Sequence, residues 1–296
     1  LNGDAWVQVG QRVVSPPEIQ AYILERLRDA AVAYMGGEVH RAVITVPAFF
    51  GETQRRAVRD AAEIAGLEAA RILSEPTAAA LAYGYAQRDS CRIMVVDLGG
   101  GTLDATIMTV HDRRFEVLGT AGDLLLGGAD FDRALAVHLA GEIERDHGVD
   151  VLGDPVALQR LVAEAETAKK ELTGQPEVMI SLPFLARGPR GNIDFQRRLT
   201  RAEYDQLTSE LVERLVAPCR AALADAGLRG PELDDVILVG GMTRSLAVQR
   251  KITELFERRP TLRVNPDEAV AIGAGLLAAG LDGRLREVTF VDVAPL

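Results

Sequence analysis

The 296-residue chain has few cysteines, few aromatic side chains and no long run of apolar residues. Its two cysteines, Cys91 and Cys219, are too few for a disulfide framework, which favours a reducing compartment and predicts a cytoplasmic location. No apolar run approaches the roughly 20 residues that a membrane-spanning helix needs, so no membrane partner is expected. The histidines also lack the spacing of metal ligands; they are His40, His111, His138 and His147.

Positive charge is also scarce relative to negative charge. The chain has 43 Asp and Glu against 33 Lys and Arg, a net charge of −10. Such a field repels polyanions, so nucleic acid is not an expected partner, although local donors and a metal ion can still hold a small anion such as a nucleotide. A hydrophobic fraction of 48% indicates a folded globular protein, and the length suits two lobes.

The first third of the chain alternates helix and strand patterns. A capping box with two prolines, at residues 15–18, predicts a helix that ends at Gly36. The apolar run 42–46 predicts a buried strand, and a helix is expected over 52–65. A short strand at 71–73 then leads to a third helix that begins near Pro76. This alternation predicts an α/β fold with a largely parallel sheet.

The middle of the chain reads as a meander followed by an insertion. Strands are predicted at 93–96, 103–110 and 115–119, with three glycines between the first two. Helices are predicted over about 130–145 and 156–172, two strand-like pieces between 177 and 199, and one helix from the capping box at Thr200 to about Ala226. The α/β pattern resumes with a strand at 235–239 and a last helix from Pro266, so residues 127–205 are expected to form an inserted subdomain.

The turn from Asp97 to Asp104 is the most informative local feature. Its three glycines, Gly99, Gly100 and Gly101, allow main-chain N–H groups to approach a phosphate closely. Two carboxylates beside a phosphate cradle indicate a cation with hard oxygen ligands, which is Mg²⁺. A tight β-hairpin with solvated aspartates explains the same pattern equally well.

A second glycine pair occurs in a similar setting. Gly240 and Gly241 follow an apolar strand and precede Thr243 and Arg244, where a nucleotide backbone can dock; the alternative is an ordinary turn between strand and helix. For Glu166, Lys169 and Lys170, which share a helix face, the pattern alone favours a solvated charged surface. It also assigns no function to Glu75, Pro47 and Arg55.

Two other nucleotide-binding patterns are excluded. The chain contains no G-x-x-x-x-G-K-[ST] sequence, so it is not a Walker-type NTPase. The G-x-G-x-x-A match from Gly273 to Ala278 lies inside a helical pattern instead of after a strand, so helix packing explains it better than dinucleotide binding.

Seven segments together resemble the DnaK-type, heat-shock-protein-70 chaperone family, in the family's order and over nearly the whole chain. They are VITVPAFF from Val43, EPTAAALAYGY from Glu75, DLGGGTLD from Asp97, GGADFDRAL from Gly127, AETAKKELT from Ala165, DDVILVGGMTR from Asp234 and NPDEAVAIGA from Asn265. The resemblance is to the nucleotide-binding domain. It implies an actin-like (ribonuclease-H-like) ATPase fold of two lobes with an inserted subdomain and a central ATP cleft.

The resemblance also implies roles for individual residues. Asp97, Thr102, Asp104 and Glu75 would be catalytic, with Asp97 and Glu75 near Mg²⁺, Glu75 through water, and K⁺ as a possible second ion. Pro47 and Arg55 would relay the nucleotide state between domains. The expected phosphate and nucleoside contacts are Gly99, Gly100, Gly101, Gly128, Glu166, Lys169, Lys170, Thr173, Gly240, Gly241, Arg244 and Asp267.

By the same resemblance, the chain divides into a remainder of lobe I (1–88), the lobe II base (89–126 and 206–284), the inserted subdomain (127–205) and an interdomain linker (285–296). The implied function is ATP hydrolysis that controls peptide binding by a C-terminal domain outside this chain. The implied partners are unfolded peptide clients, a J-domain co-chaperone and a nucleotide exchange factor. The implied ligands are ATP or ADP with Mg²⁺.

Several positions depart from the family pattern. Thr289 replaces a linker leucine, Leu103 replaces a phenylalanine, Ala129 replaces an acid, and Leu124 and Leu125 replace polar residues. The family's first phosphate loop and hydrolytic lysine would precede Leu1, so this chain alone is expected to hydrolyse ATP poorly. A non-hydrolysing nucleotide-binding or interaction scaffold is therefore an alternative. An actin-like filament protein or a sugar kinase shares the cleft but lacks the EPTAAALAYG segment and the linker.

Overall fold

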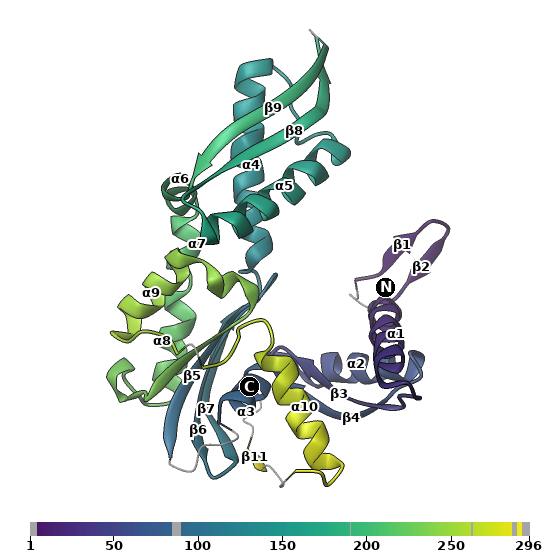
Figure 1. Ribbon diagram of the computed structural model, residues 1–296, viewed down its shortest axis with the longest axis vertical. Coiled ribbons are helices and arrows are strands. Elements are labelled where there is room, and N and C mark those ends of the chain that lie inside the picture. Colours follow the sequence, from purple (N-terminus) through teal and green to yellow (C-terminus); the bar gives the residue numbers. More distant parts are fainter. Residues whose placement is uncertain (1–4, 85–89, 190, 262, 286–288, 292–296) are drawn as a thin grey trace.

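The computed structural model describes residues 5–84, 90–189, 191–261, 263–285 and 289–291. They form a mixed α/β structure in which a central sheet joins two helical regions (Figure 1). No helix in these ranges is long and apolar enough to cross a membrane.

The N-terminal region is built on a parallel strand pair. The hairpin β1 (Val7–Val9) and β2 (Arg12–Val14) precedes α1 (Pro16–Met35), which is capped by the predicted box at Ser15. Strands β3 (Arg41–Val46) and β4 (Glu68–Ser74) flank α2 (Glu52–Ile64) and pair in parallel. The predicted helices and strands of this region are therefore confirmed, with β4 longer than expected.

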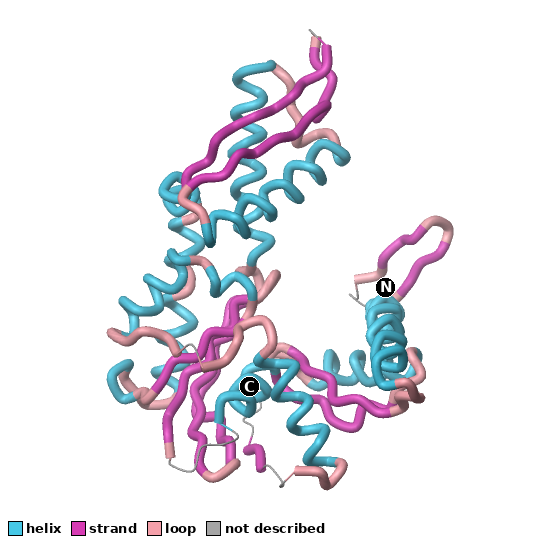
Figure 2. Tube along the Cα trace, viewed as in Figure 1, coloured by secondary structure: helices cyan, strands magenta, loops and turns pink. Residues whose placement is uncertain are grey.

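The central sheet has five strands in the order β10-β5-β6-β7-β11. Strands are magenta in Figure 2. β5 (Cys91–Leu98), β6 (Leu103–His111) and β7 (Arg114–Asp123) form an antiparallel meander. β10 (Asp235–Val239) pairs with β5 in parallel, and β11 (Thr289–Val291) pairs with β7 in parallel. The expectation of a largely parallel sheet is wrong, because short turns allow the β5–β6–β7 strands to pair as hairpins.

The edge strand β11 falls in the segment predicted as the interdomain linker, 285–296. Its partners on β7 are Arg114, Phe115 and Glu116. Residues 286–288 and 292–296, and with them most of that predicted linker, lie outside the described residues.

A helical region follows β7. It contains α4 (Gly128–His147), α5 (Pro155–Gly174) and the antiparallel strands β8 (Glu177–Gly188) and β9 (Gly191–Thr200). In Figure 1 these elements stand beyond one end of the central sheet. One continuous set of buried apolar side chains, including Phe131, Leu161 and Phe195, joins them to that sheet.

The single helix expected over 200–226 is wrong. The structure breaks it into α6 (Arg201–Leu207), α7 (Ser209–Glu213) and α8 (Val216–Asp225). The first break is at Thr208, where ψ is 8° and the hydroxyl donates to the carbonyl of Tyr204 at 2.9 Å. The third segment carries Pro218 in its first turn, where the missing N–H costs least.

The remaining helical segments come before and after β10 (Asp235–Val239) in the chain. A 3₁₀ turn, η1 (Gly230–Glu232), precedes β10, and η2 (Gly241–Arg244) follows it and leads into α9 (Leu246–Phe256). The last helix, α10 (Ala269–Leu281), begins three residues after the predicted Pro266, because Asn265 first closes a turn by accepting the N–H of Asp267.

Helix α10 packs closely against α3 (Glu75–Gly84) through Gly273. A β-carbon at Gly273 would lie 1.8 Å from the carbonyl oxygen of Ala78, so the two backbones touch at this point. Close helix packing therefore explains the first glycine of the G-x-G-x-x-A sequence, as predicted, but it does not explain Gly275, beside which there is open space.

We expect Gly273→Ala to force α3 and α10 apart and to lower the free energy of unfolding by about 1–3 kcal/mol. The control is Gly275→Ala on the same helix, since a β-carbon there meets nothing within 4 Å. The control should raise stability by up to about 1 kcal/mol, because alanine favours the helix. Urea unfolding of both variants measures the difference; equal effects would contradict the close contact.

Candidate functional site

The two glycine turns predicted from the sequence meet at one edge of the central sheet. β5 and β10 are parallel neighbours with Asp97 opposite Val239, so the turns after them emerge side by side. Gly240 has a φ of 83°, and a β-carbon on it would lie 2.4 Å from the carbonyl oxygen of Leu98 and 2.7 Å from Oδ1 of Asp97. Only glycine fits here, because the second turn is pressed against the strand that carries the first.

The first glycine turn is fixed by the start of α4. The N–H of Gly128 donates to Gly99 at 2.9 Å and the N–H of Ala129 donates to Gly100 at 2.8 Å. A β-carbon on Gly127 would lie 2.3 Å from the nitrogen of Gly101. The first N–H groups of α4 thus donate to backbone carbonyl groups, and the carbonyl groups of Gly99 and Gly100 face the start of α4.

The opposite side of the turn is open. β-Carbons built on Gly99, Gly100 or Gly101 meet nothing within 4 Å, and the N–H groups of Gly100 and Gly101 donate to no other group in the described parts of the chain. Backbone donors that have no acceptor and lie beside open space are the arrangement that binds phosphate oxygens.

Three carboxyl groups gather behind this turn. Asp97 and Asp104 are opposite each other across β5 and β6, and Glu75 begins α3. Burial, together with the charges of Glu75 and Asp104, raises the pKa of Asp97 to about 7. Burial raises the pKa of Asp104 to about 6, although Ala48 N–H donates to it. Burial and the charge of Asp104 also raise the pKa of Glu75.

These carboxyl groups fit a hydrated divalent cation better than a directly ligated one. Within the described residues, no three Asp, Glu, His or Cys side chains are placed to hold one ion. Asp104 is 1% exposed, and its Oδ1 has no hydrogen-bond partner there. A cation that keeps its waters can bridge such groups and supply the missing partner, and Mg²⁺ retains several waters in its usual sites.

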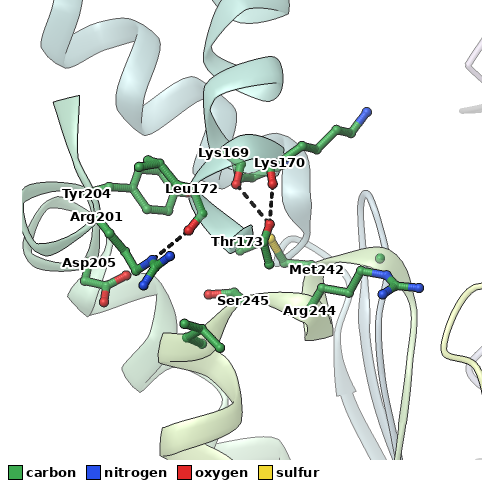
Figure 3. Close-up of a pocket in the computed structure, with 12 residues that line it drawn as sticks. Lys169, Lys170, Leu172, Thr173, Arg201, Tyr204, Asp205, Met242, Arg244 and Ser245 are labelled. Carbon is green, nitrogen blue, oxygen red and sulfur yellow. Dashed lines mark hydrogen bonds between the residues drawn. The ribbon is translucent and has the colours of Figure 1, made fainter. Parts of the chain in front are cut away.

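A pocket next to the second glycine turn is lined by two groups of residues that were predicted to bind the nucleoside (Figure 3). Lys169, Lys170 and Thr173 approach it from α5, and Gly241 and Arg244 approach it from η2. Arg244 is held at the rim, because its guanidinium donates to Asp267 at 2.5 Å and to Asn265 at 3.0 Å.

Sequence reasoning missed several other lining residues, among them Arg201 and Tyr204. Arg201 donates to the carbonyl oxygens of Leu172 and Gln175, both at 2.6 Å, and Tyr204 is 4% exposed beside it. Both come from α6, and no motif in the sequence connects α6 to this pocket. The signal was absent because the contact depends on how β9 returns the chain to the end of α5.

The charged face of α5 divides into two ion pairs. Glu166 and Lys170 form an exposed pair at 2.6 Å, one turn apart. Lys169 instead contacts Asp132 on α4, with its Nζ 2.8 Å from Oδ1 and 2.9 Å from Oδ2, and both side chains are largely buried. Asp132 was not among the predicted site residues, although it lies four residues after Gly128 in the GGADFD segment and therefore on the same helix face.

The family model for the Hsp70 protein matches residues 1–296, the whole chain. The chain belongs to the Hsp70 family. It therefore has the nucleotide-binding domain of a chaperone, in a family whose members bind ATP or ADP with a divalent metal and have ATPase activity. Client peptides and co-chaperones are partners of the family in general.

Of the two residues expected to act as an Hsp70 relay, Pro47 begins the turn between β3 and α2, and Arg55 lies at the start of α2. Phe50 N–H donates to Pro47 at 3.2 Å, and the Nε of Arg55 donates to Phe50 at 2.9 Å. The same turn supplies the Ala48 N–H that Asp104 accepts. A physical path therefore joins Arg55 to the carboxyl cluster.

The departures from the Hsp70 pattern have different structural settings. Leu103 is fully buried in the core beneath the sheet, where an apolar side chain is required. Leu124 and Leu125 are 57% and 76% exposed in the turn between β7 and α4. Ala129 is exposed on the first turn of α4.

We expect Asp97→Asn to stabilise the protein in the absence of metal and nucleotide. Asp97 has a folded-state pKa of about 7 against an ordinary value of 3.8, so the folded state binds a proton that the unfolded state has lost. Stability from this group therefore falls as the pH rises from about 4 through about 7. At pH 8 the variant should gain about 1–3 kcal/mol in urea unfolding with a chelator present, and the gain should shrink toward pH 4.

Asp123→Asn is the matched control with the opposite sign. Burial raises the pKa of Asp123, but the N–H of Leu125 and the guanidinium of Arg214 have the larger combined effect. The pKa of Asp123 therefore lies below its ordinary value. Its ionisation therefore stabilises the folded state above pH 4, and its amide variant should be less stable at pH 8. A pH-independent difference for Asp97→Asn would contradict the assigned burial of its charge.

Proposed function

We propose that this chain binds ATP with Mg²⁺ at the meeting point of the two glycine turns and contributes to its hydrolysis. The observation that supports this most directly is the pair of Gly100 and Gly101 N–H groups, which have no acceptor in the described residues and lie beside the buried Asp97 and Asp104 and the half-buried Glu75. An acidic cluster next to anion-binding donors makes physical sense when a cation lies between them.

The proposed roles follow from where each side chain lies. Gly99, Gly100, Gly101 and Thr102 hold the phosphates, and the pocket between α5 and η2 holds the nucleoside. Bound Mg²⁺ would neutralise the phosphate charge, with Asp97 and Glu75 contacting its waters. The unpartnered oxygen of Asp104 is the place where a monovalent cation such as K⁺ could bind.

In the proposed reaction, a water molecule attacks the γ-phosphorus while the bond to the β–γ bridging oxygen breaks, so that ADP leaves. Glu75 orients that water and accepts a hydrogen bond from it, since its carboxyl group lies at the N-terminus of α3 facing Asp104. The N–H groups of the glycine turn stabilise the charge that develops on the phosphoryl oxygens.

The nucleotide state is proposed to control peptide binding by a C-terminal domain. Ala48, which follows Pro47, donates to Asp104, and Arg55 of α2 donates to Phe50 in the same turn, so a change at the carboxyl cluster reaches this turn through one hydrogen bond. J-domain co-chaperones, exchange factors and a cytoplasmic location belong to the same proposal.

The first test is calorimetric titration of the chain with ADP, with Mg²⁺ and with a chelator. Binding should be at least about tenfold tighter with Mg²⁺, and Asp97→Asn should remove most of this difference while circular dichroism stays unchanged. Absence of ADP binding in both conditions would refute the proposed site.

The second test concerns the chemical step. In a chain with measurable single-turnover hydrolysis, Glu75→Gln should lower the rate by about 10²-fold and change the ATP dissociation constant little. Glu68→Gln is the control, because Glu68 is an exposed residue at the start of β4 that contacts Arg41. Equal rates for both variants would exclude Glu75 from the reaction.

A further inference from the structure

Helix α6 supplies a further side of the pocket that is proposed to hold the nucleoside. Arg201, Tyr204 and Asp205 line the pocket from this helix, and the other lining residues come from α5 and from the segment that runs from η2 into α9. In Figure 3 the side chain of Arg201 reaches the carbonyl group of Leu172. The α6 residues thus contact the same space as both predicted groups of nucleoside ligands.

Arg201 attaches α6 to the C-terminal end of α5. Its Nε donates to the carbonyl oxygen of Leu172 and its Nη2 to that of Gln175, both at 2.6 Å, and its own N–H donates to Pro176 at 2.8 Å. The last carbonyl groups of a helix have no partner within the helix, so the guanidinium supplies what α5 lacks. Leu172 and Gln175 flank Thr173, so Arg201 fixes the backbone on both sides of this pocket residue.

Asp205 attaches the same helix to the other side of the pocket. Its Oδ2 accepts a hydrogen bond from Nη2 of Arg250 on α9 at 2.6 Å. On the next residue towards η2, Nε2 of Gln249 donates to the carbonyl oxygen of Thr243 at 3.0 Å. Side-chain contacts therefore connect α6 to η2 through α9, as well as to α5.

We propose that Arg201 is a positioning residue that, through α6, sets how far Thr173 on α5 lies from Arg244 on η2 and thereby fits the pocket to a nucleoside. The inference rests on the proposed nucleotide site. Because the contact concerns the nucleoside and not the phosphates, loss of Arg201 weakens adenosine and ADP by the same factor. The gain in ADP affinity that Mg²⁺ provides stays unchanged.

The test compares ligands with and without phosphate. The unchanged protein and Arg201→Met are titrated with ADP and Mg²⁺, with ADP and a chelator, and with adenosine by competition against a fluorescent ADP analogue. We expect about tenfold weaker binding in all three titrations, since two hydrogen bonds are lost. Arg201→Lys should recover part of this loss, because an ammonium group can donate to one of the two carbonyl groups.

The matched control removes an arginine that makes the same kind of contact elsewhere on α5. Arg160 donates to the carbonyl oxygens of Pro183 at 2.6 Å and Phe184 at 2.7 Å, and it is not among the described residues that line the pocket. Arg160→Met should therefore lower stability in urea unfolding as Arg201→Met does, while its affinity for ADP and adenosine stays within about twofold of the unchanged protein.

A second variant tests the attachment to α9 without touching the nucleoside pocket. The Arg250 side chain is 63% exposed and, unlike Asp205, does not line that pocket in the described structure, so Arg250→Gln should fold normally. Since an exposed ion pair contributes little, we expect binding of both ADP and adenosine to weaken by only about two- to fivefold.

The outcomes separate the role of Arg201 from the proposed function. Weakening of ADP alone, unchanged binding by folded Arg201→Met, or an equal loss in Arg160→Met would overturn the positioning role and leave the nucleotide site standing. If Arg201→Met does not fold, Arg201→Lys and Arg250→Gln decide, and unchanged adenosine binding in either overturns the role. Failure of the unchanged protein to bind ADP would overturn the nucleotide site and the role of Arg201 with it.

Discussion

The concentration of buried negative charge at the ends of β5 and β6 is the constraint on which the rest of the site depends. Burial raises the pKa of Asp97, Asp104 and Glu75, and neighbouring carboxylate charges raise the pKa of Asp97 and Glu75 further. Such an arrangement is unfavourable by itself and becomes favourable when a cation arrives with its anion. The ligand therefore provides the counter-charge that the fold leaves out.

The elements around this cluster act as rigid walls. α4 fixes the carbonyl side of the glycine turn, Gly240 presses the second turn against Asp97, and the turn at Ala48 donates to Asp104. The position of the glycine turn relative to the carboxyl groups is therefore fixed from three sides.

Predictions from the sequence were most successful where the structure of a segment is determined by residues within that segment. The capping box at Ser15, the strand–glycine–strand hairpin around Gly100 and the helix packing at Gly273 are all confirmed. They failed where distant segments compete. The parallel sheet expected from alternating helices and strands is mixed, and the helix over 200–226 is broken at Thr208, because hairpin pairing and a local side-chain hydrogen bond override periodicity. They also missed Asp132, whose importance comes from a lysine 37 residues away.

By itself the sequence determined which segments are helices and strands, where glycine is obligatory and which carboxyl groups accompany it, because these follow from local sterics and from spacing along one segment. Only the tertiary structure decided that the turns after β5 and β10 share one edge, that Lys169 pairs with Asp132, and that Ala48 reaches Asp104. Those contacts depend on strand order and on burial, and burial is a property of the whole packed chain: it sets the pKa of Asp97 near 7 although an isolated aspartate would be ionised.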